Sequence, residues 1–312
     1  MKIRIAYLFL ISTLFLAGCK SALVATTSQS KAEISLAETE HIISELSSDK
    51  MEGREYGTDG YNRAADWVIK YLTDAGVKPF FSEHQDMLTI GGKKTANIVG
   101  LIGKRDDSKE YILLGAHLDH IGKVKSKTDS VYNGANDDAS GVTGVLQIAH
   151  YLQKTKPDAN VIVALFTAEE SGLLGSNYLA KRMKALNIKI RYMLNFEMIG
   201  KAMTIGEDKV YITGFHRSNF ASVANELLNT PFVHYLPEEI SYDLFRRSDN
   251  YAFFQAYGVP CHTISTFDFN NYNYYHGLKD EVSELDIKNM NAVINISATL
   301  IEKLIEADTR IK

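Results

Sequence analysis

Five short segments of this chain carry side chains that bind divalent metal ions. The side chains are imidazoles and carboxylates: His117, Asp137, Glu169 with Glu170, Glu197 and His276. Zinc prefers these ligand types in catalytic sites, where one coordination position also stays open for water or substrate. A lone histidine or a carboxylate that opens a helix is often only structural, so no single segment indicates a metal site. The joint pattern predicts a hydrolase with two zinc ions.

The ligand-type residues stand where apolar runs end. His117 and Glu169 each follow a run expected to be a buried strand, and in open α/β sheets ligands bind where such strands end. Asp119 lies two residues after His117, so both should face the same side, with Asp119 orienting the imidazole from behind. Because Glu169 and Glu170 are adjacent, we expect them to divide two roles, with one binding metal and the other accepting a proton.

Alternating strand and helix patterns must position these residues. Short aliphatic runs predict strands at 95–102, 111–116, 161–166, 192–196, 209–213 and 261–265. Helical spacing of apolar residues predicts helices at 59–75, 141–153, 171–185, 219–228, 250–256 and 285–305. This order predicts an α/β fold of three layers, in which a mixed, mostly parallel central sheet has helices on both faces.

Composition excludes some partners. The 312-residue chain has a formal net charge of -4 and a pI near 6.2, and its lysines are dispersed, so no nucleic-acid partner is expected. It has two cysteines, Cys19 and Cys261. Cys261 lies in an apolar run and is expected to be a buried, inert thiol.

The N-terminal segment indicates export. Two basic residues precede an apolar run of about 13 residues over 5–17, which is too short for a helix to span a bilayer of roughly 30 Å. The run ends in Leu-Ala-Gly-Cys, which resembles a bacterial lipoprotein cleavage site with Cys19 as the lipidated residue. Residues 1–18 are therefore expected to be a lipoprotein signal peptide. The product would be anchored to a bacterial membrane by lipid, on the periplasmic side of the cell envelope.

The remaining chain divides in two by composition. Residues 19–35 are rich in Ser, Thr and Ala without periodicity, which predicts a flexible tether. Residues 36–312 are then expected to form a single domain that holds the zinc site.

Together the segments resemble those of the co-catalytic zinc aminopeptidase family, whose relatives include bacterial leucine-type aminopeptidases, glutaminyl cyclases and glutamate carboxypeptidases. The resemblance covers nearly all of the expected mature chain, including 46–54 and the helix after it. It implies a zinc-exopeptidase (phosphorylase/hydrolase-like) fold, two zinc ions per chain and peptide substrates.

The resemblance also assigns ligands. It implies that Asp137 bridges two zinc ions, with His117 and Glu197 completing one site and Glu170 and His276 the other. Many family members have Asp where this chain has Glu197, and the extra methylene bears on the affinity and identity of the metal there.

By the same resemblance, Glu169 would be the general base that activates a metal-bridging water, and cleavage would release N-terminal residues from peptides. Tyr275 would either stabilise the oxyanion or line the pocket with the other aromatic residues of 267–275. Arg246 and Arg247 would either bind a peptide carboxylate or lie on a solvated face. A glutaminyl cyclase-like acyltransferase and a catalytically silent binding protein on the same fold are the alternatives.

Overall fold

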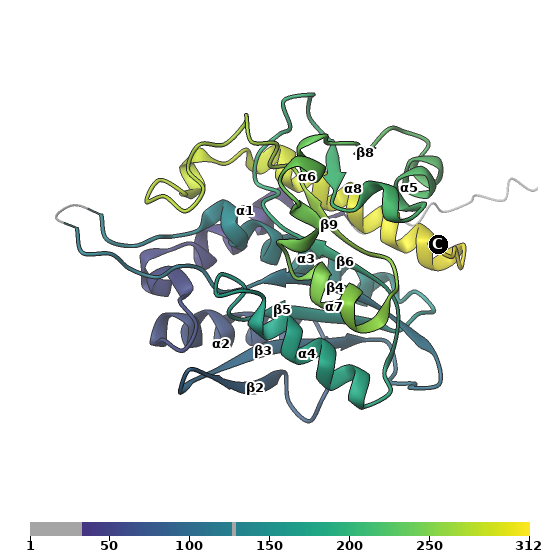
Figure 1. Ribbon diagram of the computed structural model, residues 1–312, viewed down its shortest axis with the longest axis horizontal. Helices are drawn as coiled ribbons and strands as arrows, with labels where there is room; N and C mark the ends of the chain where they lie inside the picture. Colours follow the sequence, from purple (N-terminus) through teal and green to yellow (C-terminus); the bar gives the residue numbers. More distant parts are fainter. Residues whose placement is uncertain (1–32, 127–128) are drawn as a thin grey trace, which may run out of the picture. The chain divides into compact units, whose positions relative to one another are not determined.

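The computed structural model describes residues 33–126 and 129–312, which lie within one compact unit (Figure 1). The expected signal peptide, the lipidation site Cys19 and most of the expected tether lie outside the described residues. The end of the tether range differs from the expectation. Ile34 is buried, and its backbone forms hydrogen bonds with Asn291 and Asn295 of the C-terminal helix α8 (Ile287–Glu306). Ser35 caps α1 (Leu36–Leu46), so the folded unit includes at least these last tether residues.

Nine strands form one mixed sheet in the part of the chain that the structure describes. They are β1 (Lys78–Pro79), β2 (Gln85–Ile90), β3 (Lys93–Ile102), β4 (Glu110–His117), β5 (Val161–Phe166), β6 (Lys189–Phe196), β7 (Val210–Ile212), β8 (Val233–His234) and β9 (Cys261–Ser265). The order is β1-β3-β5-β4-β6-β9-β7-β8, with β2 paired to β3. The central strands β5, β4, β6 and β9 are parallel, and antiparallel pairs with β3 and β7 flank them on either side.

Helices cover both faces of the sheet (Figure 1). The other helices are α2 (Asp59–Asp74), α3 (Gly141–Thr155), α4 (Leu174–Ala185), α5 (Phe220–Leu228), α6 (Glu238–Ser241) and α7 (Asn250–Tyr257). Short turns of helix are η1 (Asp49–Arg54), η2 (Ala135–Ser140), η3 (Phe215–Arg217), η4 (Leu244–Arg246) and η5 (Val282–Glu284). One core cluster joins the sheet to α1, α2, α3 and α8, and a second joins the opposite face to α4 and α7.

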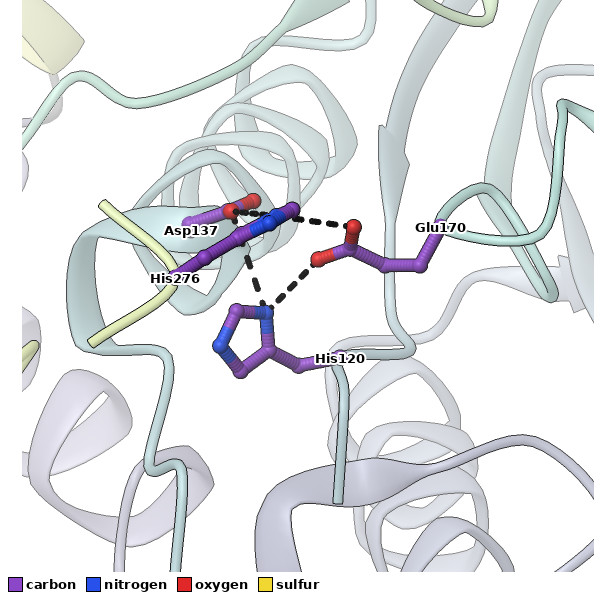
Figure 2. Close-up of side chains that lie close together, drawn as sticks. All are labelled: His120, Asp137, Glu170 and His276. Carbon is purple, nitrogen blue, oxygen red and sulfur yellow. Dashed lines mark hydrogen bonds and ion pairs between the residues drawn. The ribbon is translucent and has the colours of Figure 1, made fainter. Parts of the chain in front are cut away.

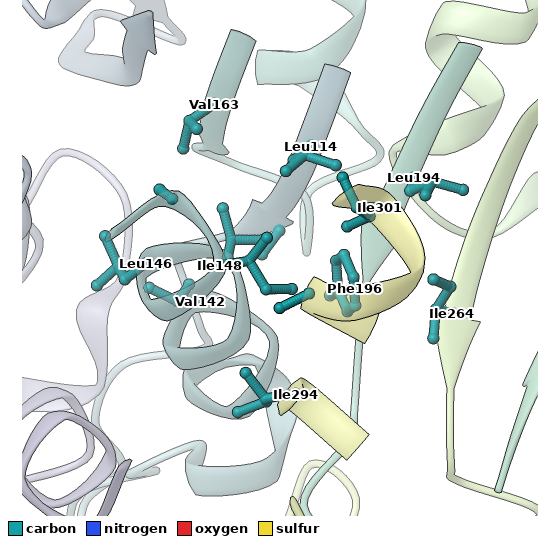
Figure 3. Close-up of a cluster of buried hydrophobic side chains, with 14 of the residues drawn as sticks. Leu114, Val142, Leu146, Ile148, Val163, Leu194, Phe196, Ile264, Ile294 and Ile301 are labelled. Carbon is teal, nitrogen blue, oxygen red and sulfur yellow. The ribbon is translucent and has the colours of Figure 1, made fainter. Parts of the chain in front are cut away.

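The larger of the two core clusters stabilises the centre of the sheet. Ile148 of α3 and Ile301 of α8 pack with Leu114 of β4 and Phe196 of β6, and all four are fully buried (Figure 3). Burying side chains of this size contributes roughly 1.5–3 kcal/mol each. This packing stabilises β4 and β6, and the loops that carry the ligand-type residues begin at the ends of these strands.

The predicted fold class is confirmed, as a three-layer α/β arrangement around a mixed sheet. The predicted strands at 161–166 and 261–265 coincide with β5 and β9. Parallel pairing covers the centre of the sheet and the short pair β7 and β8 at one edge, whereas β1, β2 and β3 form antiparallel pairs at the other edge. No helix among the described residues is long and apolar enough to cross a membrane.

Candidate metal centre

The ligand-type residues gather at the carboxyl edge of the parallel strands. His117 is the last residue of β4 and is in register with Phe166, the last residue of β5. Glu169 and Glu170 follow β5 after Ala168, whose positive φ of 54° turns the chain sharply. Glu197 follows β6 directly, and His276 lies in the long loop after β9. Chain segments more than a hundred residues apart thus meet at one edge.

Four side chains form a compact cluster at this edge: His120, Asp137, Glu170 and His276 (Figure 2). One ligand atom from each lies within 4.8 Å of the others. Glu170 stands between two imidazoles, with Oε1 at 2.8 Å from His120 Nδ1 and Oε2 at 2.9 Å from His276 Nε2. Imidazole nitrogens and carboxylate oxygens converging in this way match the donor set of zinc.

The two oxygens of Asp137 face different imidazoles. Oδ1 lies 3.2 Å from His117 Nε2, whereas Oδ2 lies 3.1 Å from His276 Nε2 and 3.8 Å from His120 Nδ1. A carboxylate placed between two sets of ligand atoms can bridge two cations. Asp137 is also nearly inaccessible to solvent, so water cannot replace these contacts.

Asp119 lies beside His117, as expected, but contacts it most closely through its backbone. His117 Nδ1 donates to the backbone carbonyl of Asp119 at 3.0 Å, while the Asp119 carboxylate is 4.0 Å away. The chain leaves β4 at His117, and this turn brings the carbonyl beneath the ring. The carboxylate instead accepts the backbone N–H groups of Glu169 at 3.0 Å and Glu170 at 3.4 Å. With Nδ1 protonated by this bond, the lone pair of His117 lies on Nε2, which points at Asp137.

Glu197 is not in direct contact with the histidines. Its carboxylate accepts a hydrogen bond from the Ser248 hydroxyl, and no ion pair joins it to a histidine in the described ranges. Asn195 also donates to the Ser248 hydroxyl oxygen, at 2.8 Å, so a short polar chain fixes this carboxylate beside β6. The structure thus brings Glu197 to the same edge, where its carboxylate is bonded to Ser248.

Two buried carboxylates that the sequence did not single out organise the loops. Asp138 accepts backbone N–H groups from His117 at 3.3 Å and Met198 at 3.0 Å, and so joins the ends of β4 and β6. Asp280 accepts the N–H of Asp137 at 3.1 Å and the Tyr272 hydroxyl at 2.6 Å. Asp280 therefore ties the loop of His276 to that of Asp137.

Arg54 is a third residue that sequence reasoning missed. Its guanidinium is fully buried and donates to four backbone carbonyls, those of Leu46, Leu118, Asn133 and Gly134, at 2.7–2.9 Å. Arg54 thereby links the ends of α1 and η1 to the loop after β4 and to the loop before η2. Its place in the 46–54 segment was the available signal, but its partners are far away in sequence.

The acidic groups of the centre are difficult to ionise together. Burial raises the pKa of Asp119 to about 6 and those of Glu197 and Asp249 to about 7. Burial also raises the pKa of Glu169 well above its usual value, and the nearby carboxylates of Glu197 and Asp249 raise it further. Buried carboxylates in this number need positive charge among them.

The pKa values of two histidines in the centre are also raised, which favours the charged form of these side chains. Asp137 and Glu170 raise the pKa of His276 to about 10. Burial alone would lower the pKa of His117, yet the carboxylates of Glu169, Asp137 and their neighbours raise it well above 6.5. The buried Nε2 of His120 has no hydrogen-bond partner, and the buried Nε2 of His117 faces only the Asp137 carboxylate, at 3.2 Å. These nitrogens and the excess of carboxylates fit bound divalent cations, which would satisfy both.

A cavity of about 320 Å³ opens beside the cluster. Glu197, Ser248 and Tyr275 are among its lining residues. The Tyr275 ring stacks on His276 with the ring centroids 3.9 Å apart, so it lies at the boundary between cluster and cavity. Part of the aromatic run expected to line a pocket does so, through Phe267, Phe269 and Tyr275.

His120 belongs to the cluster although it is not among the ligands expected from the sequence. The loop after β4 aims the two rings differently, with His117 toward Asp137 and His120 toward Glu170. The signal was the close spacing of the two histidines at a strand end, which allows both to reach one site.

Comparison with known proteins gives matching results for the family and the fold. A family model described as peptidase family M28 matches residues 97–301. Aminopeptidase Y of Saccharomyces cerevisiae is 32% identical over 203 residues, covering 62% of this chain and 35% of the yeast protein. A probable zinc metalloprotease of Pyrenophora tritici-repentis is 28% identical over 155 residues, covering 46% of this chain and 32% of that protein. The chain thus spans about a third of the length of these two relatives.

Solved structures share the fold at low sequence identity. The LapA aminopeptidase of Legionella pneumophila superimposes with a TM-score of 0.69 at 20% identity, covering 87% of this chain and 71% of that one. The glutaminyl cyclase of Porphyromonas gingivalis gives a TM-score of 0.67 at 18% identity, covering 86% and 99%. Both similarities extend over nearly all of the described residues.

Proposed function

The chain belongs to peptidase family M28, and on this premise we propose that it is a zinc-dependent aminopeptidase that releases N-terminal residues from peptides. One observation carries the proposal: the two oxygens of Asp137 face different imidazoles. This placement suits a carboxylate that bridges two zinc ions, with His117 and Glu197 holding one and Glu170 and His276 the other. The name of the yeast relative, aminopeptidase Y, supports the same activity.

The zinc ions and the side chains would carry different parts of the reaction. Zinc bound there would polarise the scissile carbonyl and lower the pKa of water to about 7. Glu169 accepts the proton of the attacking water and returns it to the leaving amine. Its backbone N–H, held by the Asp119 carboxylate at 3.0 Å, fixes its position at the strand edge. Partial burial and the nearby carboxylates, Asp137 first, raise the pKa of Tyr275, so its hydroxyl stays protonated and can donate to the developing oxyanion.

A panel of aminoacyl chromogenic amides, combined with zinc analysis of the purified protein, tests the proposal. We expect two zinc ions per chain, release of the chromophore, and loss of activity on chelation. Cyclisation of N-terminal glutamine with one zinc ion would indicate the acyltransferase alternative. Zinc binding without either activity would indicate a silent binding protein.

We also propose that the enzyme is exported and held at a bacterial membrane by lipid on Cys19. The support lies in the sequence: a short apolar run after two basic residues, followed by Leu-Ala-Gly-Cys. Peptides outside the cytoplasm would then be its substrates.

A further inference from the structure

The cavity beside the metal centre combines aromatic walls with one cation. Tyr242, Phe267, Phe269 and Tyr275 form a continuous set of rings, with centroid separations of 4.7 Å, 4.7 Å and 6.1 Å along it. Among the residues that line this cavity, Arg247 is the only basic one. An apolar cavity with a few polar groups is the usual form of a small-molecule site.

Arg247 differs from its neighbours in having an unengaged side chain. The guanidinium of Arg246 lies 3.6 Å from Asp243 and above the Tyr251 ring, at 5.3 Å from its centroid. Arg217 lies over the Phe245 ring at 4.3 Å. Within residues 33–126 and 129–312, no ion pair or ring contact engages the Arg247 guanidinium, and its side chain is exposed.

The acidic residue that shares the cavity does not neutralise Arg247. Glu197 accepts its hydrogen bond from Ser248, and in the described structure it forms no ion pair with Arg247. Under the proposed function Glu197 is a metal ligand, so its negative charge would be compensated by zinc and not by Arg247. Arg247 is left as a free positive charge in an aromatic cavity.

We propose that Arg247 binds a carboxylate of the substrate, an inference that rests on the proposed aminopeptidase function. Its planar guanidinium can donate two parallel hydrogen bonds to a carboxylate, which a neutral substrate cannot accept in the same way. The aromatic rings contact the apolar part of the same substrate. The substrate class is therefore a short or acidic peptide.

Two sources can supply this carboxylate. One is the side chain of an N-terminal glutamate, and the other is the carboxyl terminus of a dipeptide. The volume of about 320 Å³ is near the lower end of the roughly 300–1,000 Å³ typical of ligand pockets, which suits one residue or a dipeptide.

The test uses two substrate pairs that differ only in charge. Glutamyl and glutaminyl coumarin amides probe the side-chain source, and Leu-Leu and its C-terminal amide probe the carboxyl-terminal source. The purified, zinc-loaded protein is compared with Arg247→Gln and Arg247→Lys. The control is Arg246→Gln, because the Arg246 guanidinium pairs with Asp243 and does not line the cavity. Thermal melting establishes that each variant is folded.

The ratio of kcat/KM for the charged substrate to that for the neutral one is the readout. Arg247→Gln should lower this ratio by about 10- to 100-fold in at least one pair, the usual worth of a charged hydrogen bond. Arg247→Lys should lower it less, and Arg246→Gln should leave it unchanged. Cleavage of the substrates with ratios that Arg247→Gln does not alter would overturn this inference alone. Failure to cleave any of them would overturn the proposed function and the inference with it.

Discussion

At the residue scale, backbone groups fix the centre as much as side chains do. The backbone carbonyl of Asp119 sets the tautomer of His117. The carboxylate of Asp119 accepts hydrogen bonds from the backbone N–H groups of Glu169 and Glu170. Asp138 joins the turns after β4 and β6 in the same way. These bonds orient the ligand-type side chains before any ion binds, which reduces the cost of assembling a metal site.

Glu197 gives a first prediction, because it is proposed as a zinc ligand although its carboxylate is bonded to Ser248 in the structure. Glu197→Gln keeps the shape and removes the charge, so one zinc ion should be lost more readily while the other stays. Zinc titration of the purified variant measures this. Two ions bound at unchanged affinity would show that Glu197 is not a ligand.

The sequence indicated where His117, Glu170 and Glu197 would lie, because each is at or just after the end of a buried strand. It did not predict the supports, since these depend on contacts between remote segments. Asp280 contacts a backbone 143 residues away, and Arg54 donates across 64 to 80 residues to loops beside the cluster. The place of His120 in the cluster could not be predicted for a similar reason, because the direction of its ring depends on the turn after β4.

At the element scale, Arg54 of η1 links three segments and gives the second prediction. Arg54→Met would leave buried carbonyls without donors, so the free energy of unfolding should fall by about 3–5 kcal/mol. Thermal unfolding should show a Tm lower by roughly 10 °C. The control is Arg63→Met in α2, whose guanidinium is about half exposed and pairs with Glu52 at 2.8 Å. That variant should stay within about 1 kcal/mol of the wild type; equal losses in both would contradict the structural role of Arg54.

The third prediction concerns His262 in β9. Burial lowers its pKa to about 4, with Nδ1 donating to the Thr213 carbonyl at 2.8 Å and Nε2 accepting from Ser218 at 2.7 Å. Since the unfolded chain binds this proton near pH 6.5 and the folded one does not, stability is present above pH 6.5 and falls as the pH drops toward 4. The loss should be roughly 2–3 kcal/mol between pH 7.5 and 4.5.

Urea unfolding of chelator-treated protein checks this, since metal release then plays no part. His262→Gln should be less stable at neutral pH but should lose about 2–3 kcal/mol less than the wild type on acidification. Identical pH dependence in both proteins would show that His262 does not titrate differently on folding.

Elements were predictable in proportion to their burial. The central strand β5 is buried at every position and is a continuous apolar run. Strand β2 was missed because polar and apolar residues do not match its two faces: Asp86 is buried, whereas Met87 is about half exposed. Strands β1 and β8 have two residues each, and so few residues carry no periodic signal.

At the scale of the whole molecule, two helical layers hold the sheet while its carboxyl edge stays free for the centre and the cavity. The fourth prediction concerns how this molecule is held in place. Cys19→Ser should release the protein from membranes without loss of specific activity, because the expected lipid would lie outside the peptidase fold. Fractionation of cells with an activity assay on each fraction measures this. Continued membrane association of the variant would contradict lipidation at Cys19.

The adjacent pair Glu169 and Glu170 provides the most direct test of a zinc centre served by a separate base. Zinc content and kcat should be measured side by side for Glu169→Gln and Glu170→Gln. Glu169→Gln should keep both ions while kcat falls by roughly 10²–10⁴, whereas Glu170→Gln should lose zinc and regain part of its activity when zinc is added. Loss of zinc from Glu169→Gln with retention in Glu170→Gln would reverse the two roles, and full activity in both variants would contradict the catalytic account.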